Sequence, residues 1–311
     1  MVFAHGVRRT STAIIARRVI AFGCSIIMPG VYARCAGAGI ELAAEPDSKV
    51  LAHAASGSIA RSYNLLLETA AACDDLEALV VLHEDAEIID RDFCHELRHA
   101  LADPEVAVVG CVGVTGVRDI AWWDGSPRGN SAPYHYGELG GGQLHWRGLG
   151  KEADNGPGEV DAVYGVMLAL SPWAVRNLRL DESIGMLHGY DFDICRQARA
   201  AGRKVLTADL GIAHHHSLDL VKDIEIWAAA HMRAAEKWEI GAPPEQAEDA
   251  WKARARRAEA AAAAARLLAA SKLLQADATN RYYTQQVQEI QSSRSWHYTE
   301  PLRRASLVAR T

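Results

Sequence analysis

Two acids and a histidine follow an apolar run in the first third of the chain. His83, Glu84 and Asp85 come directly after residues 79–82, whose β-branched character predicts a strand. Carboxylates at the end of a strand suit a hard divalent cation, because such ions prefer oxygen ligands and bridge the oxygens of a diphosphate. The structural alternative is that these acids cap the next turn, and the residues alone leave the two interpretations balanced.

A second acidic pair opens a helix predicted over 191–202. Asp191 and Asp193 lie in its first turn, just after Gly189 and Tyr190. One interpretation is structural, because acids are favoured near the positive end of a helix dipole. The catalytic interpretation is that Asp191 is a general base at the helix start and faces a cleft.

Three consecutive histidines form the third cluster. His214, His215 and His216 follow a strand predicted over 204–210. A neutral imidazole at a strand end can complete a divalent metal site that carboxylates begin. A single histidine is more often structural, whereas three in a row favour a function without identifying which one binds.

Strands and helices that could position these clusters alternate along the chain. This alternation predicts an α/β fold with a mostly parallel, doubly wound sheet flanked by helices, in which ligands collect beyond the carboxyl ends of the strands. Ser58 is the expected N-cap of the first long helix. Predicted strands cover 18–28, 50–53, 79–82, 106–114 and 204–210, a strand pair covers 159–171, and helices cover 59–73, 92–102 and 191–202.

The remaining segments have distinct compositions. Residues 116–158 are rich in Gly and Trp, and the rings of Trp122 and Trp123 could stack on a sugar or pin the segment to the core. Residues 245–275 are Ala-rich and predict a helix of about 45 Å, which favours a solvated or coiled-coil role. The Arg-rich leader 1–17 is expected to be disordered.

The overall composition excludes several classes of protein. The 311 residues are 49% hydrophobic and 23% charged, as in ordinary globular proteins. A net charge of −6 does not favour nucleic-acid binding. None of the six cysteines forms a C-x-x-C pair, which indicates reduced thiols in the cytoplasm. No apolar segment reaches the ~20 residues of a membrane helix, and peripheral contact at the inner face of the membrane is left open.

Six pieces in a fixed order resemble the glycosyltransferases of family two, which have the GT-A fold. The closest subgroup is the glycosyltransferase-like branch, which carries His-x-Asp in place of the usual Asp-x-Asp. The resemblance covers roughly 18–217. It runs through residues 20–25, 58–64, 83–85, 159–165, 189–193 and the histidine run.

The resemblance implies a role for each matching residue. Asp85 would be the carboxylate ligand of a divalent metal ion, Mn or Mg, and Asp191 the base. His215 or His216 would be the histidine near the metal. Donor contacts would come from Ser25, Asn64, His83 and Glu84, and Trp122, Trp123 and Asp193 would lie on the acceptor side or its loop. His83 replaces the first acid of the common motif, and 161–165 lacks its usual second acid, so the metal site has fewer carboxylates.

The implied reaction moves a sugar from a nucleotide diphosphate donor to a hydroxyl of a glycan or lipid-linked acceptor, with inversion, in surface polysaccharide or glycan synthesis. The expected domain covers 18–240, with a nucleotide half over 18–115 and an acceptor half over 116–240. A helical extension covers 245–311, and a homodimer through this helix is left open. Residues 293–303 resemble a tail that follows some bacterial glycosyltransferase domains of surface-polysaccharide systems.

Two alternatives compete with this assignment. His95, Glu96 and His99 fit H-E-x-x-H, the signature of helical zinc peptidases. Arg98 lies between the two histidines, however, and a cation beside Zn²⁺ is electrostatically unfavourable. The other alternative is a non-catalytic scaffold that binds a nucleotide sugar, which the replacement of an acid by His83 favours.

Overall fold

The main sheet of the protein has six strands. The computed structural model describes residues 19–117, 126–129, 133–135, 143–145, 156–215, 224–240 and 250–299. Within them the strand order is β12-β5-β11-β3-β1-β2. All neighbours pair in parallel except β11, which is antiparallel to both β3 and β5. The strands are β1 Val19–Ile26, β2 Lys49–Ala54, β3 Leu76–Leu82, β5 Val106–Gly110, β11 Met167–Leu170 and β12 Lys204–Thr207.

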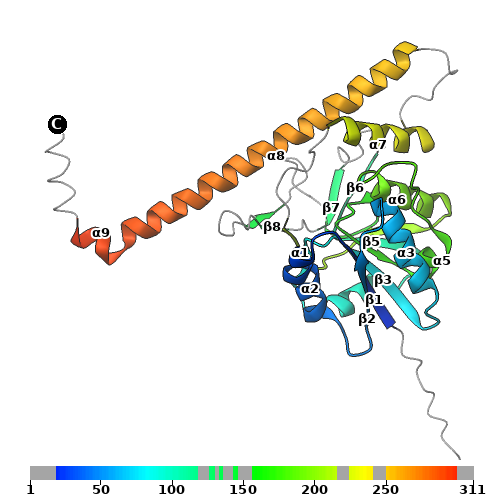
Figure 1. Ribbon diagram of the computed structural model, residues 1–311, viewed down its shortest axis with the longest axis horizontal. Coiled ribbons are helices and arrows are strands. Elements are labelled where there is room, and N and C mark those ends of the chain that lie inside the picture. The colour runs from blue at the N-terminus through cyan, green and yellow to red at the C-terminus, as the bar shows by residue number, and fades with distance from the viewer. Residues whose placement is uncertain are drawn as a thin grey trace, which may run out of the picture.

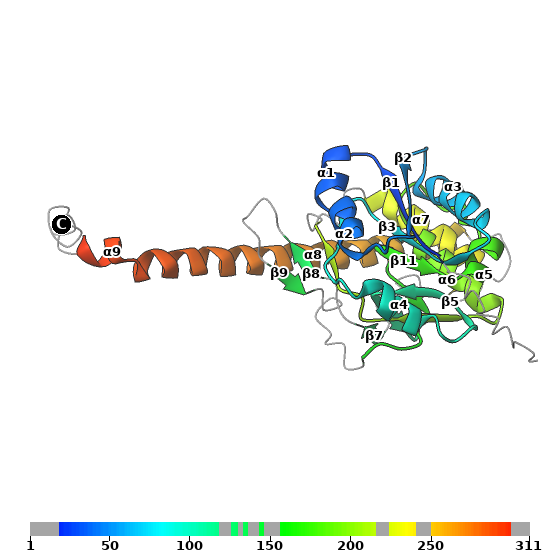
Figure 2. The same ribbon diagram turned by 90° about the horizontal axis from the view of Figure 1, so that it is seen from below.

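Helices cover both faces of this sheet (Figures 1 and 2), which confirms the predicted α/β class. One hydrophobic cluster packs α3, α5 and α6 on one face, and the other packs α2 and α4 on the opposite face. Side chains of β3 alternate between them, with Leu79 and Val81 in the first and Val80 and Leu82 in the second. The bounds are α1 Pro29–Arg34, α2 Ala36–Ala43, α3 Ile59–Ala71, α4 Phe93–Ala100, α5 Pro172–Asn177 and α6 Tyr190–Ala200.

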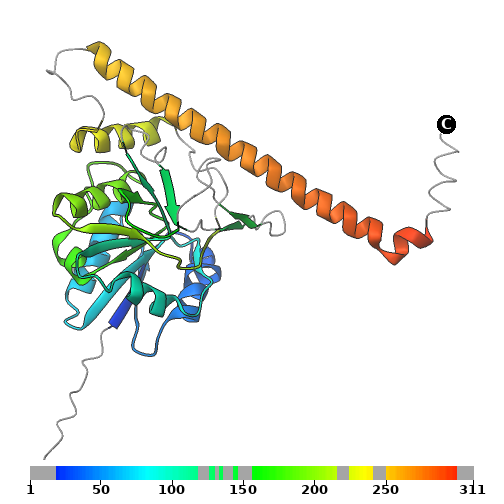
Figure 3. The ribbon, with the colours of Figure 1, turned by 180° about the vertical axis from the view of Figure 1, so that it is seen from behind.

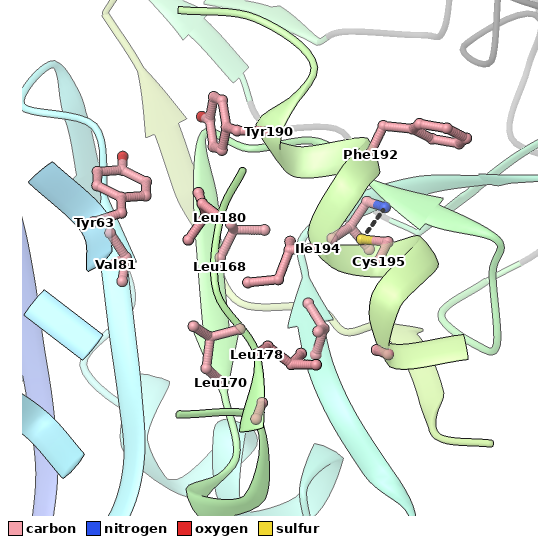
Figure 4. Close-up of a cluster of buried hydrophobic side chains, with 14 of the residues drawn as sticks. Tyr63, Val81, Leu168, Leu170, Leu178, Leu180, Tyr190, Phe192, Ile194 and Cys195 are labelled. Carbon is pink, nitrogen blue, oxygen red and sulfur yellow. Dashed lines mark hydrogen bonds between the residues drawn. The ribbon is translucent and has the colours of Figure 1, made fainter. Parts of the chain in front are cut away.

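The hydrophobic cluster on the α6 side reaches the carboxyl end of β3. Figure 4 shows Leu168 and Leu170 of β11 beside Val81 of β3, facing Ile194 and Cys195 of α6. Tyr63 and Tyr190 close one end of this cluster. Their rings meet edge to face with centroids 5.6 Å apart, a favourable aromatic arrangement.

Two smaller sheets flank the main one. One has the order β10-β6-β7 and the other β4-β13-β8-β9. Their strands are β6 Val112–Thr115, β7 Ser126–Gly129, β10 Ala162–Val163, β4 Ala86–Ile88, β13 Ile212–His214, β8 Pro133–His135 and β9 Gln143–His145. Antiparallel pairing places His214 of β13 opposite Ala86 of β4, so the histidine run lies beside the turn that follows β3.

Several element bounds differ from the sequence prediction for identifiable reasons. The predicted strand 18–28 ends at Ile26, because Pro29 opens α1 at a position that suits proline. The run 106–114 forms two strands, β5 and β6, in different sheets. Ser58 caps α3 as predicted, and its side chain accepts a hydrogen bond from the Arg61 backbone N–H.

The C-terminal part is helical, as expected, but the helix is longer than predicted. α7 spans Ile224–Lys237, α8 Ala250–Ser292 and α9 Arg294–Tyr298. α8 therefore extends for about 64 Å at a rise of 1.5 Å per residue. Figures 1 and 3 show α7 between α8 and the α/β body, and α8 projecting beyond it. None of the described helices is both long and apolar enough to cross a membrane.

Candidate active site

A cavity of about 350 Å³ opens at the carboxyl ends of β1 and β3. Its walls come from these strand ends, the start of α3, residues 164–166, the turn that opens α6, β13 and α7. This is the position in which ligands bind in open α/β sheets. Six residues that the sequence analysis named or placed in the histidine run line it: Ser25, His83, Glu84, Asp85, Asp191 and His214.

The first functional group of the cavity consists of His83, Asp85 and His214. Each offers one ligand atom, and these atoms all lie within 4.8 Å of one another. Nε2 of His214 lies 3.2 Å from Oδ1 of Asp85. Two imidazoles and one carboxylate are a suitable donor set for a divalent metal ion. These residues therefore fit the metal that the sequence pattern implies.

Backbone contacts hold the turn that carries this group. The His83 backbone N–H donates to the Val166 carbonyl at 3.1 Å, and the Ala86 N–H donates to the His83 carbonyl at 3.1 Å. The His215 N–H donates to the Asp85 carbonyl at 2.8 Å, which joins this turn to the end of β13. The backbone of the turn after β3 is thus fixed from two directions.

Tyr190 contacts the imidazole of His83. The Tyr190 hydroxyl donates to the Gly165 carbonyl at 2.9 Å, and its oxygen lies 2.6 Å from Nε2 of His83. Burial raises the pKa of Tyr190, so this hydroxyl keeps its proton. Tyr190 therefore ties the imidazole of His83 to the Gly165 backbone and orients this ring in the cavity wall.

The structure brings His214, rather than His215, to Asp85. Side chains alternate along β13, so the two histidines point to opposite sides of the strand. Nε2 of His215 lies 2.6 Å from Oε2 of Glu87, outside the group of three. This corrects the expectation that His215 lies at the metal, and His216 lies outside the described residues.

Asp191 is the second functional group. It lies in the first turn of α6 and is 8% exposed. Its Oδ2 accepts from the Gly165 N–H at 3.0 Å and its Oδ1 from the Phe192 N–H at 2.8 Å. Burial raises the pKa of Asp191 to about 6, although the backbone hydrogen bonds oppose this rise. A carboxylate with a pKa near the working pH suits a general base.

Gly165 lets Asp191 and Tyr190 approach the backbone. A Cβ at this position would lie 2.3 Å from the Tyr190 hydroxyl and 2.9 Å from Cβ of Asp191. Any larger residue would push both side chains away from their partners. Neither Gly165 nor Tyr190 was predicted from the sequence to be a site residue. The sequence offered one indication of their role, because both residues lie in segments that carry the family resemblance.

Glu84 has a structural partner, although it also lines the cavity. Its Oε2 accepts from the backbone N–H groups of Ile27 and Met28, both at 2.8 Å. These groups lie between the end of β1 and the start of α1, so the carboxylate binds two adjacent elements together. Ser25, at the end of β1, lines the same cavity as predicted for a donor contact.

Asn64 and Asp193 do not line the cavity. Asn64, which was predicted to contact the donor, exchanges two hydrogen bonds of 2.9 Å with the backbone of Leu180. Asp193 is 0% exposed, and its Oδ1 lies 2.8 Å from both Nζ of Lys237 and Nε1 of Trp238. Residues two apart on a helix point about 200° apart, so Asp193 faces α7 while Asp191 faces the cavity. Trp122 and Trp123 lie outside the described residues.

The H-E-x-x-H motif lies elsewhere, on α4. Nε2 of His95 and Nε2 of His99 are 3.1 Å apart on an exposed face, and neither residue lines the cavity. Arg98 is held by ion pairs of 2.6 Å to Glu45 and 2.8 Å to Glu77. Within the described chain, the group of three candidate metal ligands lies at the cavity instead. The two histidines of the motif therefore lie apart from the cavity that holds the candidate ligands.

A helix-flanked sheet that brings candidate metal ligands after β3 and a buried carboxylate into one cavity is the arrangement expected of a glycosyltransferase. Residues 29–236, more than half of the chain, match the model of the glycosyltransferase like family. The chain belongs to this family.

Individual proteins and solved structures also match the chain. The chain is similar to streptomycin biosynthesis protein StrF of Streptomyces griseus, with 28% identity over 204 residues that cover 64% of this chain and 67% of that protein. It is also similar to the crystal structure of GalNAc-T7 with UDP, GalNAc and Mn²⁺, with 11% identity and a TM-score of 0.44. This match covers 71% of this chain and 47% of the other. The mannosyltransferase PcManGT from Pyrobaculum calidifontis, in complex with GDP-Man and Mn²⁺, matches at 11% identity, 90% and 82% coverage and a TM-score of 0.44.

Proposed function

We propose that this glycosyltransferase moves a sugar from a nucleotide diphosphate donor to an acceptor hydroxyl, with inversion at the anomeric carbon. One observation carries the proposal: a buried carboxylate, Asp191, lines the same cavity as the ligand group His83, Asp85 and His214. The base acts on the acceptor and the ion on the donor diphosphate, and both must act at the same time on substrates that lie side by side. A shared cavity supports this joint action.

The base step follows from the surroundings of Asp191. Its carboxylate accepts the proton of the acceptor hydroxyl while that oxygen forms a bond to the anomeric carbon. The bond from this carbon to the donor phosphate breaks, and the nucleoside diphosphate leaves with the electron pair. The Gly165 and Phe192 N–H groups hold the two carboxylate oxygens in place throughout. A single base opposite the leaving group produces inversion.

The proposed metal is Mn²⁺ or Mg²⁺, held by Asp85, His83 and His214. When bound, the ion supplies positive charge that offsets the charge on the leaving diphosphate. Among the described residues that line the cavity there is no Lys or Arg. Those residues therefore offer no cation of their own for the diphosphate, which supports metal dependence. Two imidazole ligands favour Mn²⁺ over the harder Mg²⁺.

The proposed acceptor is a glycan or a lipid-linked sugar, and the proposed setting is surface polysaccharide or glycan synthesis. The resemblance of the tail 293–303 to the tails of such enzymes supports this setting. The name of StrF offers an alternative, because it places that relative in the synthesis of a small-molecule antibiotic. A panel of nucleotide sugars, screened by thermal shift with and without Mn²⁺, would identify the donor, because a selective ligand stabilises the folded state.

Nucleoside diphosphate release from that donor is the decisive test. We expect release that EDTA abolishes and Mn²⁺ restores, and that Asp191→Asn removes while donor binding persists. Release that ignores chelation would remove the metal from the proposal. A protein that binds the donor but never releases nucleoside diphosphate, with any acceptor or with water, would instead be the non-catalytic scaffold.

The proposal also includes a homodimer through α8. Tyr283, Val287 and Ile290 are about half exposed on this helix, at spacings of four and three residues. Apolar residues at this alternation form the seam of a two-stranded coiled coil. Sedimentation of the wild type and of Val287→Asp tests it. A wild-type monomer at micromolar concentration would refute the dimer and leave the chemistry untouched.

A further inference from the structure

The H-E-x-x-H motif of α4 has no part in the proposed transfer reaction. Its two histidines, His95 and His99, lie four residues apart on this helix, and both are exposed. Residues at this spacing are neighbours on one face of an α-helix. The Nε2 atoms of the two side chains lie 3.1 Å apart, and the rings are nearly perpendicular, with centroids separated by 4.5 Å. The two imidazoles therefore form a pair at the surface.

The distance between the two nitrogens is the one that a single metal ion requires. The bond from zinc to an imidazole nitrogen is about 2.0–2.1 Å long. Two such bonds to nitrogens 3.1 Å apart enclose an angle of about 100° at the ion, which is close to that of tetrahedral coordination. A neutral imidazole can carry its proton on Nδ1, so both Nε2 atoms can offer a lone pair to the ion.

The positive charge of Arg98, which follows the motif's glutamate by two residues, is offset by two carboxylates. Its Nη2 lies 2.6 Å from Oε2 of Glu45, and its Nε lies 2.8 Å from Oε2 of Glu77. Glu77 belongs to β3, so the guanidinium is held against the body of the protein. These ion pairs weaken the electrostatic objection to a cation on this helix.

Asp92 adds negative charge on the same side of the helix. It precedes His95 by three residues and His99 by seven, and both spacings return to one face of an α-helix. Asp92 is the N-cap residue of α4, but its side chain makes no capping hydrogen bond. An exposed carboxylate at this position attracts a cation to the pair of imidazoles.

We propose that His95 and His99 form a surface site for a divalent transition metal ion of the Zn²⁺, Ni²⁺ and Cu²⁺ class, distinct from the metal site of the cavity. Nitrogen ligands bind these ions more tightly than Mn²⁺, and Mg²⁺ prefers oxygen. The ion links two successive turns of α4 and stabilises the folded chain by mass action. Neither histidine lines the cavity, so this inference does not rest on the proposed transfer reaction.

A titration of the full chain with Zn²⁺ alone tests the site. The protein is stripped of metal with EDTA, dialysed free of chelator and titrated by calorimetry. We expect His95→Ala and His99→Ala each to bind one ion fewer than the wild type. His297→Ala is the matched control, because it removes a single exposed imidazole from another helix, α9, and it should bind as many ions as the wild type.

The cavity group also suits Zn²⁺, so the affinity of the pair is measured in a His214→Ala chain. In this background, His99→Ala should lower the affinity of the remaining site at least about tenfold, since even outer-sphere substitutions change metal affinity by about 10- to 100-fold. Circular dichroism establishes that each variant is folded. If His214→Ala does not fold, the count of ions in the single variants decides by the same criterion.

The outcomes separate this site from the transferase. Equal Zn²⁺ binding by the wild type, His95→Ala and His99→Ala would overturn the inference, as would an equal loss in His297→Ala. Mn²⁺-dependent release of nucleoside diphosphate should stay at the wild-type level in both α4 variants, and its loss there would show that the two metal sites are not distinct. Absence of this release in the wild type would refute the transferase and leave the zinc site in place.

Discussion

Two acidic motifs, His83-Glu84-Asp85 and Asp191-Phe192-Asp193, divide their carboxylates in the same way. In the turn after β3, Asp85 lies with His83 and His214, whereas Glu84 holds the backbone between β1 and α1. In the first turn of α6, Asp191 faces the cavity, whereas Asp193 pairs with Lys237 of α7. In each motif one acid is available for chemistry, and its neighbour fixes the element that carries it.

The comparison teaches that the kind of partner, rather than the residue type, separates the two roles. Glu84 accepts two backbone N–H groups from another loop, and Asp193 is enclosed by a lysine and an indole N–H. Asp191 also accepts two backbone N–H groups, from Gly165 and Phe192, but burial raises its pKa to about 6. Substitutions within each motif should therefore have unlike consequences for activity and stability.

The largest effect is expected from Asp191→Asn. The amide keeps the size of the side chain but cannot accept the acceptor proton, so kcat should fall about 10³-fold, within the usual range for a general base. Donor and Mn²⁺ affinity should stay close to wild type. Steady-state kinetics and calorimetric donor binding measure the two quantities. Turnover within threefold of the wild type would contradict the base assignment.

Substitutions in the histidine run should give the next largest effect. His214→Ala removes a proposed ligand, so Mn²⁺ affinity in the presence of nucleoside diphosphate should fall about 100-fold, the upper end of the effects seen even for outer-sphere partners. His215→Ala is the matched control. It breaks the contact with Glu87 and should change Mn²⁺ affinity far less. Equal losses in the two variants would show that this face of β13 does not select the ligand.

His214 and His215 also show which features the sequence could not predict. Asp85 and Asp191 were predicted from local patterns, because an acid after a strand and an acid at a helix start are visible in a few residues. The choice among His214, His215 and His216 depended on which side of β13 faces the turn after β3. A shift of one residue in strand pairing reverses that side. Pairing with β4 is a long-range contact, which the local sequence does not encode.

The same distinction holds for the fold. The alternation of strands and helices predicted the α/β class, because hydrophobic periodicity is a local property. The insertion of β11 antiparallel between β3 and β5 was not foreseen, because it depends on which strands meet. The structural contact of Asn64, which was predicted to bind the donor, was not foreseen for a related reason. Its partner is the backbone of Leu180, far away in the sequence.

Asp193→Asn should chiefly affect stability. The substitution leaves Lys237 without one of its two carboxylates, since Asp181 also lies 2.8 Å from Nζ of Lys237. The free energy of unfolding should fall by about 2 kcal/mol, below the usual cost of breaking a buried ion pair because Lys237 is partly exposed. Chemical denaturation measures the loss. Turnover per folded molecule should remain near wild type. A 10³-fold loss of this turnover would instead assign Asp193 a catalytic role.

The pH dependence of activity should follow Asp191. Burial raises its pKa to about 6, and the base acts only as a carboxylate, so kcat/KM should fall tenfold per unit as pH drops below about 6. The effect on stability has the opposite sign. The raised pKa favours the folded state below pH 3.8, and this contribution is lost as pH rises through 6. A flat kcat/KM between pH 5 and pH 7 would contradict the assignment.

Glu84→Gln should give the smallest effect and the sharpest comparison with Asp85. Glutamine keeps an oxygen acceptor for the N–H groups of Ile27 and Met28 but loses the negative charge. The free energy of unfolding should fall by about 1 kcal/mol, the difference between charge-assisted and neutral hydrogen bonds. Mn²⁺ affinity should change by less than about threefold, whereas Asp85→Asn should abolish measurable binding. If both variants lose Mn²⁺ equally, the two adjacent acids share the ion, and the division of roles fails in this motif.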